Sequence, residues 1–145
     1  MSRELMWLTL TVILTGVLWI PYILDRIMVR GLMGAVANPS RSDKPQAPWA
    51  QRLYFAHTNA VENLVVFAPL VLILEAQGHS TESTVIACAV YFWARLAHAV
   101  IYALGGLLGT RLAHHLAGYK QALTLTFSGI VVAVGLYIVA KSIIG

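Results

Sequence analysis

Long runs of apolar residues alternate with polar segments along the chain. Residues 5–24 contain no charged side chain, and at 1.5 Å per residue a helix of this length spans the roughly 30 Å of a hydrocarbon core. Runs at 53–74, 84–104 and 121–140 are also long enough to cross. The pattern predicts an all-α integral membrane protein with four transmembrane helices, in a single domain over residues 1–145.

The first run is longer than the apolar region of a secretory signal, and it ends near Trp19, Pro21 and Tyr22 rather than at an alanine-like cleavage site. We therefore expect an uncleaved helix. The polar segment 25–52, which contains three prolines, is expected to be a long exposed connection. Gly78 is the expected stop of the second span.

Composition supports a membrane setting. Hydrophobic residues make up 59% of the chain and charged residues 11%, with a mean hydropathy of +0.74. This is too apolar for a soluble domain of this size or for a disordered chain. The net charge of +4 would suggest nucleic acid for a soluble protein, but here the basic residues lie outside the spans and report topology. No nucleic-acid partner is expected, and the lone Cys88 excludes a disulfide framework within the chain.

The basic residues are distributed asymmetrically about the predicted spans. Arg3 and Lys141 lie on the side of the termini, whereas seven basic residues lie in the first and third connections. The positive-inside rule then places both termini outside and these two connections in the cytoplasm. The first connection is also suited to anionic lipid headgroups, through Arg26, Arg41 and Lys44.

Two charged residues lie within predicted spans and need a physical explanation. A charge at the bilayer centre costs about 2.5–3.5 kcal/mol on insertion scales. Glu62 and Arg95 lie at similar depth if the second and third spans are antiparallel neighbours. The sequence therefore predicts an intramembrane Glu62–Arg95 pair.

Further polar residues gather on one face of each of these helices. At 100° per residue, four residues of the third span fall within about 60° of one another: Tyr91, Arg95, His98 and Tyr102. On the second span Asn59, Glu62 and Asn63 share a sector of about 100°, while His57 points elsewhere. Two interpretations stay open: a hydrogen-bonding site for a ligand, or a buried network that fixes helix register.

Other familiar site patterns are absent from the sequence. It has no HExxH motif and no Cys/His pair at ligand spacing, so no metal site is expected. GxGxxG, P-loop and GxSxG motifs are missing too, which removes support for nucleotide binding and serine hydrolysis.

Two segments resemble the family of membrane-associated proteins in eicosanoid and glutathione metabolism (MAPEG), which includes microsomal glutathione transferases. The pattern H-x-N-x-x-E at 57–62 is similar to the family's second helix, and R-x-x-H-x-x-x-Y at 95–102 to its third. The tripeptide 37–39, Ala-Asn-Pro, resembles one in the family's first connection. The number and spacing of predicted spans agree along the whole chain.

The resemblance implies a homotrimer of left-handed four-helix bundles, with glutathione as co-substrate bound between subunits near the cytoplasmic side. Arg111 resembles the arginine that stabilises the glutathione thiolate. The remaining residues that match ligand contacts of the family are Arg30, Asn59, Glu62, Arg95, His98 and Tyr102. Without the resemblance, Arg111 would be interpreted as a basic residue that anchors topology.

The chain also departs from the family pattern. Phe55 and Thr58 replace basic residues that many relatives use for the carboxylates of glutathione, which leaves Arg52 as a substitute. His115 matches a tyrosine of some relatives, and Leu112 a catalytic serine of prostaglandin E synthase. Prostaglandin isomerisation is therefore not expected, and another thiol or anion in place of glutathione stays possible.

The leading hypothesis is a membrane glutathione transferase or peroxidase. It would activate the glutathione thiolate for attack on a lipophilic electrophile or a lipid hydroperoxide. The alternative is a non-enzymatic lipid-binding or scaffold protein, because one branch of the family presents lipid to a partner. A small four-helix multidrug exporter is disfavoured, since those proteins carry a glutamate in the first helix and this chain has no acid between Glu4 and Asp25.

Overall fold

The computed structural model describes residues 1–105 and, beyond them, 129, 133, 135–137, 139–140 and 144. This part of the chain is helical and contains no strand, so the predicted all-α class is confirmed. Four helices have described bounds: α1 Arg3–Val17, α2 Trp19–Val36, α3 Pro48–Ala76 and α4 Glu82–Leu104. The predicted span 121–140 lies largely outside the described residues.

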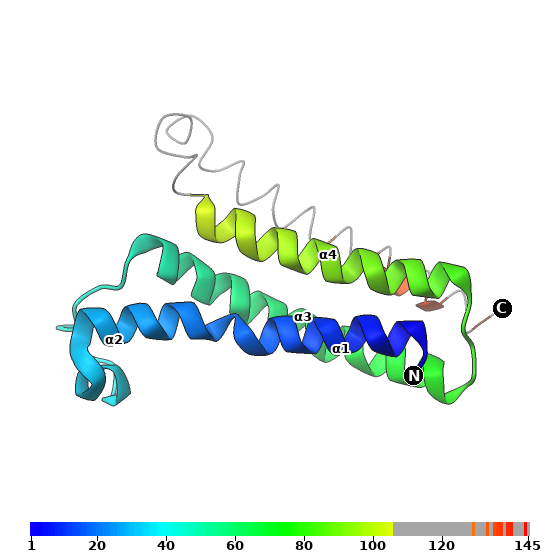
Figure 1. The fold of residues 1–145 in the computed structure, drawn as a ribbon, viewed down its shortest axis with the longest axis horizontal. Helices are drawn as coiled ribbons and strands as arrows, with labels where there is room; N and C mark the ends of the chain where they lie inside the picture. Colours follow the sequence, from blue (N-terminus) through cyan, green and yellow to red (C-terminus); the bar gives the residue numbers. More distant parts are fainter. Residues whose placement is uncertain (106–128, 130–132, 134, 138, 141–143, 145) are drawn as a thin grey trace.

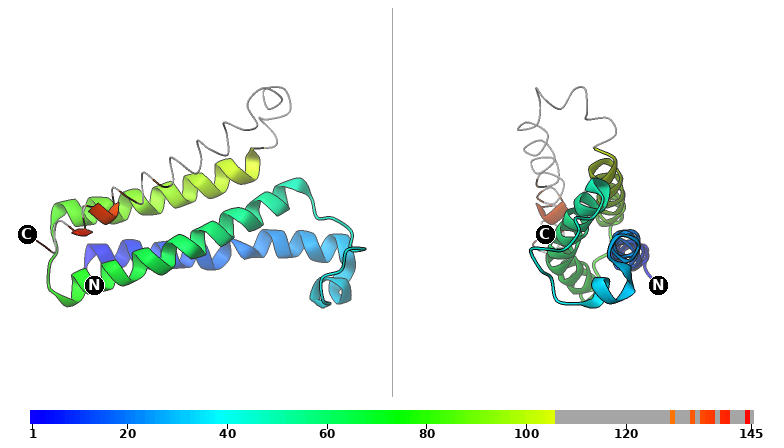
Figure 2. Two further views of the ribbon diagram at one scale, coloured as in Figure 1. Left: turned by 180° about the vertical axis from the view of Figure 1, so that it is seen from behind. Right: turned by 90° about the vertical axis from the view of Figure 1, so that its left-hand side faces the viewer.

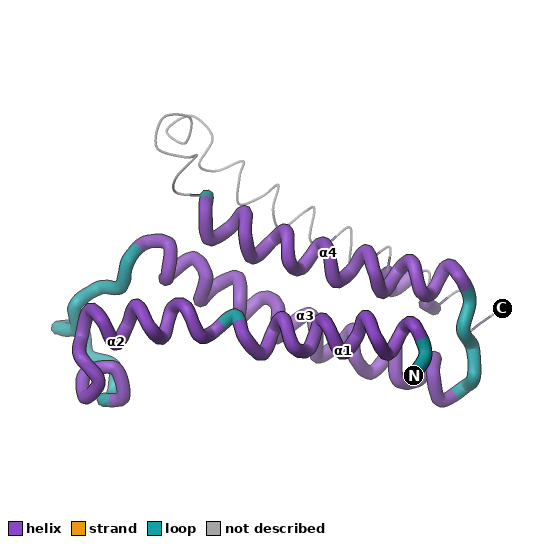
Figure 3. Tube along the Cα trace, viewed as in Figure 1, coloured by secondary structure: helices purple, strands orange, loops and turns teal. Residues whose placement is uncertain are grey.

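The first two helices, α1 and α2, follow each other almost on one line (Figure 1). Only Leu18 separates them, and its backbone N–H still donates to Leu14 O at 3.2 Å. Proline explains the interruption, visible in Figure 3, because Pro21 has no N–H for the carbonyl of Val17 four residues earlier. Together α1 and α2 form one apolar segment, Arg3–Val36.

Three helical segments are long and apolar enough to cross a membrane: Arg3–Val36, Pro48–Ala76 and Glu82–Leu104. The predicted spans 53–74 and 84–104 fall within the second and third. In the most apolar stretch of Arg3–Val36 only 22% of the residues are buried. In the corresponding stretch of Glu82–Leu104 the buried share is 39%. These helices therefore present apolar side chains outward, as expected of a protein whose surroundings are lipid.

The three segments pack around a common axis rather than in one layer (Figure 2). Helix α1 contacts both α3 and α4, and α2 packs against α3. The main core lies where α1, α3 and α4 meet, at Leu8, Phe67, Val71, Cys88 and Tyr91. The rings of Phe67 and Tyr91 stack with centroids 3.7 Å apart. This core holds α3 and α4 together as antiparallel neighbours, as the sequence predicted.

A buried carboxylate joins the beginning of α1 to the beginning of α4. Glu4 is 1% exposed, and its Oε1 accepts hydrogen bonds of 2.7 Å from Ser80 Oγ and Thr84 Oγ1. Thr84 also forms a capping box with Thr81, which starts α4. The turn before α4 thus fixes the N-terminal ends of two helices at once.

The connections differ in part from the sequence prediction. Helix α3 ends at Ala76, and Gly78 adopts a positive φ of 68°, which confirms it as the stop. The first connection is shorter than the expected 25–52, because α2 continues to Val36 and α3 begins at Pro48. Residues 25–36 contain no proline to stop the helix, whereas Pro48 is suited to the first helical turn.

Candidate functional site

A hydrogen bond between α3 and α4 connects the two polar faces inside the apolar segments. Arg95 is 3% exposed, and its Nη1 donates to Asn59 Oδ1 at 2.9 Å. The Asn63 amide donates to the carbonyl of Asn59 at 2.6 Å, which fixes the neighbouring turn of α3. The sequence correctly indicated that these two faces meet.

The predicted ion pair between Glu62 and Arg95 is wrong. Glu62 lies on the exposed side of α3, and among the described residues the ion pair found is a different one, between Arg30 and Asp43. Glu62 follows Asn59 by three residues and so lies about 60° around the helix from it. Because Asn59 occupies the inner position, the Glu62 carboxylate faces the outside of this chain.

The aromatic residues of the polar stripe continue from Arg95 in both directions along α4. On one side the guanidinium lies 5.7 Å from the ring centroid of Tyr91, within the range of a cation–π contact. On the other side the rings of His98 and Tyr102 stack, with centroids 5.4 Å apart and planes 19° from parallel. Both rings are half-buried. The stripe therefore combines a buried cation with an accessible imidazole and phenol.

Arg30 lies apart from this stripe, at the end of α2. Its Nη1 pairs with Asp43 Oδ2 at 2.8 Å, and its Nε donates to the carbonyl of Lys44 at 2.9 Å. Asp43 Oδ2 also accepts from Ser40 N at 3.0 Å. Arg30 thus fastens the connection 37–47 to α2, a contact that the sequence did not predict.

Arg52 has a structural partner of its own. Its Nε donates to the carbonyls of Tyr102 and Ala103 at 3.1 and 3.3 Å, and its Nη2 to Ala103 at 3.0 Å. These carbonyls belong to the last turn of α4, where a cation also complements the helix dipole. Arg52 is therefore not a free replacement for the missing basic residues.

Phe55 and Thr58, which replace basic residues of the family pattern, both lie near the beginning of α3. Phe55 is 58% exposed on α3, and the Thr58 hydroxyl donates to the carbonyl of Tyr54 in its own helix at 3.1 Å. Neither side chain supplies a positive charge at this end of α3. Arg111, Leu112 and His115 lie outside the described residues.

Sequence reasoning also missed a polar contact between α2 and α3. Tyr22 Oη lies 2.9 Å from His57 Nδ1, so α2 and α3 are joined as α3 and α4 are. Tyr54 packs edge-on against Tyr22 at 5.5 Å. Helical spacing correctly predicted that His57 points away from Asn59 and Glu62. The partner of His57 depends on the register between α2 and α3, and spacing within one helix does not report that register.

Removal of Arg52 tests its role at the end of α4. Arg52→Ala should destabilise the protein by about 1.5–3 kcal/mol, because hydrogen bonds from a charged group are lost at a helix end. Thermal unfolding in detergent, followed by circular dichroism, measures this effect. Arg41→Ala is the matched control, because Arg41 is exposed and forms no hydrogen bond with a described residue. Equal melting temperatures for the two variants would contradict the assignment.

Apolar outward faces and an internal polar contact between crossing helices define an integral membrane protein of the all-α class. The chain belongs to the MAPEG family, whose sequence profile matches residues 5–140. The comparisons with curated proteins and with solved structures found no match. Family membership confirms the resemblance drawn from the motifs and supports a membrane function in glutathione-related or eicosanoid metabolism in general terms.

Proposed function

We propose that this protein is a glutathione-dependent transferase or peroxidase that acts on a lipophilic substrate in the membrane. The observation that carries the proposal is the junction of α3 and α4, where Arg95 and Asn59 are hydrogen-bonded beside the stacked His98 and Tyr102. Family membership gives this junction its chemical interpretation, because MAPEG proteins generally use glutathione.

The residues of the junction suit the polar groups of glutathione. The exposed Glu62 carboxylate is available to the ammonium of the tripeptide, and half-buried His98 and Tyr102 offer hydrogen-bonding groups. Arg95 and Asn59 would orient the ligand, and Arg30 would reach its carboxylate on opening of the Asp43 contact. The outward position of Glu62 supports a site completed by a neighbouring subunit, as in a homotrimer.

Arg111 carries the chemistry in this proposal. A thiol with a pKa near 8.5 is only a few per cent thiolate at pH 7, and an adjacent guanidinium favours the anion. The thiolate sulfur then attacks an electrophilic carbon, a carbon–sulfur bond forms, and the leaving group departs with its electron pair. With a hydroperoxide, two glutathione molecules are oxidised to the disulfide while the peroxide is reduced to an alcohol and water.

The arrangement of charges supports the proposed topology. The basic residues Arg26, Arg30, Arg41, Lys44 and Arg52 all lie at the same end of the helices, from the later part of α2 to the beginning of α3. With this end in the cytoplasm, glutathione enters from the cytoplasm and the lipophilic substrate from the bilayer. Binding of both reactants in contact would supply most of the rate.

A second function, lipid binding without catalysis, is favoured by one observation. Phe55 and Thr58 supply no cation, and Arg52 already binds backbone carbonyls. Fewer basic groups therefore remain for the two carboxylates of glutathione than in relatives with a basic second helix. A scaffold protein that presents a lipid to a partner would not need these groups.

Turnover in vesicles distinguishes the two functions. The reconstituted protein is supplied with glutathione and an aryl halide, or with glutathione and a fatty-acid hydroperoxide, and products are quantified by mass spectrometry. We expect conjugate or alcohol to form faster than in protein-free vesicles. Binding of the hydroperoxide with no product above that background would contradict the enzyme and favour the lipid-binding protein.

A further inference from the structure

Helix α2 bends sharply before it ends. Gly31 has a φ of +71° and a ψ of 167°, a conformation that residues with a side chain rarely adopt. No atom lies within 4 Å of the position that a Cβ would take, so the backbone conformation rather than space requires glycine here. Beyond it, residues 32–36 turn aside from the axis of α2 (Figure 1).

The turn beyond Gly31 is apolar and exposed. Leu32 is 65% exposed, Met33 79% and Val36 73%, and Met28 on the preceding turn is 77% exposed. Such a cluster is unfavourable in water but stable where it meets the acyl chains of a bilayer.

The length of the helix places this turn at a membrane boundary. A straight helix over Arg3–Val36 would extend about 50 Å, well beyond the roughly 30 Å of a hydrocarbon core. The charge-free run ends at Leu24, so Arg26 and Arg30 reach the headgroup level. The bend at Gly31 then keeps the last apolar turn near the membrane surface instead of extending it into water.

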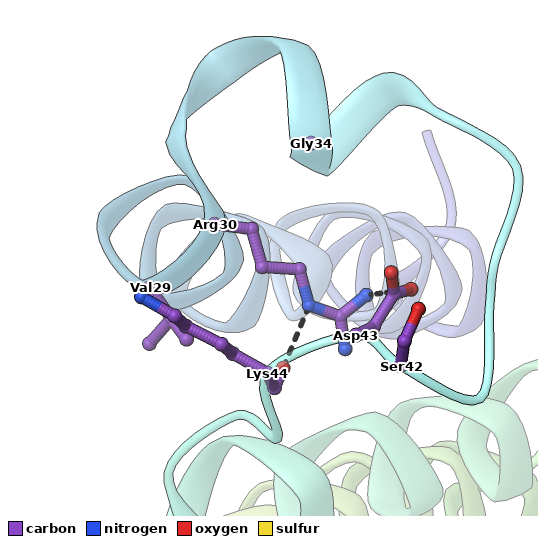
Figure 4. A pocket seen from close by; sticks show the side chains of 6 residues that line it. All are labelled: Val29, Arg30, Gly34, Ser42, Asp43 and Lys44. Carbon is purple, nitrogen blue, oxygen red and sulfur yellow. Dashed lines mark hydrogen bonds and ion pairs between the residues drawn. The ribbon is translucent and has the colours of Figure 1, made fainter.

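A pocket of about 230 Å³ lies between this turn and the connection that follows, lined by Val29, Arg30, Gly34, Ser42, Asp43 and Lys44 (Figure 4). Asp43 and Arg30 neutralise each other in an ion pair. Lys44 is exposed, and its side chain extends along the pocket toward Val29 (Figure 4). Because Arg41 is also exposed nearby in the sequence, the surroundings of the pocket carry a net positive charge.

We propose that this pocket binds the headgroup of an anionic membrane phospholipid. The Lys44 ammonium contacts the phosphate, and the apolar turn 32–36 lies against the acyl chains. The Ser42 hydroxyl lies 2.9 Å from Ser40 Oγ and donates to the phosphate when it accepts from Ser40. The combination of a basic pocket with an adjacent exposed apolar turn fits a lipid, because a free anion would use only the first of these features. The site does not depend on the proposed function.

Native mass spectrometry of the detergent-purified protein tests the proposal. Equal concentrations of phosphatidylglycerol and phosphatidylcholine are added, and the fractions of protein that retain each lipid are compared. The wild type should retain phosphatidylglycerol preferentially, and Lys44→Gln should reduce this preference about fivefold, which corresponds to about 1 kcal/mol for one basic residue at an anionic surface. Gly31→Ala should reduce it as well, because alanine disfavours the bend.

Arg3→Gln is the matched control, because it removes an exposed basic residue at the opposite end of the helices and should leave the preference unchanged. Equal retention of the two lipids by the wild type would overturn the proposal. So would equal effects of Lys44→Gln and Arg3→Gln. If Leu32→Gln dissociates an oligomer and leaves lipid retention unchanged, a second copy of the chain covers the turn, and the proposal is likewise wrong.

Discussion

Replacement of Arg111 by alanine should lower the rate of glutathione turnover by about 10- to 30-fold while the protein remains folded. A thiol with its ordinary pKa of about 8.5 is only about 3% thiolate at pH 7, and a nearby guanidinium that lowers this pKa by about 1–3 units raises the thiolate fraction to between about 25% and almost 100%. Initial rates at saturating electrophile and pH 7 measure the effect. Circular dichroism in detergent establishes that the helices are retained.

Raising the pH separates this role from a loss of binding. Because the thiol in the variant titrates near its ordinary pKa of about 8.5, Arg111→Ala should recover much of its rate between pH 7 and pH 9.5. Lys120→Ala removes a second basic residue of the same predicted connection and should change the rate little. Equal losses in the two variants, or a loss in Arg111→Ala that does not respond to pH, would remove Arg111 from thiolate formation.

Replacement of Asn59 by leucine should destabilise the protein by about 1.5–3 kcal/mol. The variant has a similar volume but loses the acceptor for Arg95, and hydrogen bonds to charged groups contribute in this range. The expected readout is a lower melting temperature in detergent. Asn59→Asp should lose less, because a carboxylate oxygen still accepts the hydrogen bond.

Asn63→Leu provides the control for this substitution. Asn63 lies one turn further along α3, and among the described residues it donates to a backbone carbonyl of its own helix. Its replacement should cost about 0.5–1.5 kcal/mol, as expected for a neutral hydrogen bond. A melting temperature of Asn59→Leu equal to or above that of Asn63→Leu would show that the contact between α3 and α4 contributes little.

The sequence predicted the helices well because their signal is local. A long apolar run is sufficient to recognise a span, even where it contains a single charged residue such as Glu62 or Arg95. The stop at Gly78 follows from the conformational freedom of glycine. Periodicity within one helix also placed Arg95, His98 and Tyr102 on one face. That face meets α3 in the structure, at Asn59.

The errors concern contacts between segments. Glu62 was expected to pair with Arg95 on grounds of depth and charge, but a rotation of α3 by about 60° decides whether Asn59 or Glu62 points inward. The buried position of Glu4 depends on Ser80 and Thr84, far away in the sequence. Residue spacing within one helix carries no information about such registers.

The bend in α2 at Gly31 was not predicted for a different reason. Residues 25–36 were expected to belong to the exposed connection but form the later part of α2, and a glycine within a helix does not by itself predict a positive φ. The ion pair between Arg30 and Asp43 fixes the connection beside this bend. The sequence did not predict this pair, because the two residues meet only when the connection folds back onto α2. The same contact shows why Arg30 needs rearrangement before it can bind a ligand carboxylate.

The central claim is that this membrane protein binds glutathione as a thiolate, and ultraviolet difference absorbance tests it most directly. Glutathione is titrated into the purified protein in detergent at pH 7, and the thiolate absorbance is recorded against protein alone and glutathione alone. This measurement requires no assumption about the second substrate. We predict a saturable thiolate signal with one ligand per site. No signal up to millimolar glutathione would contradict the account and favour the lipid-binding function.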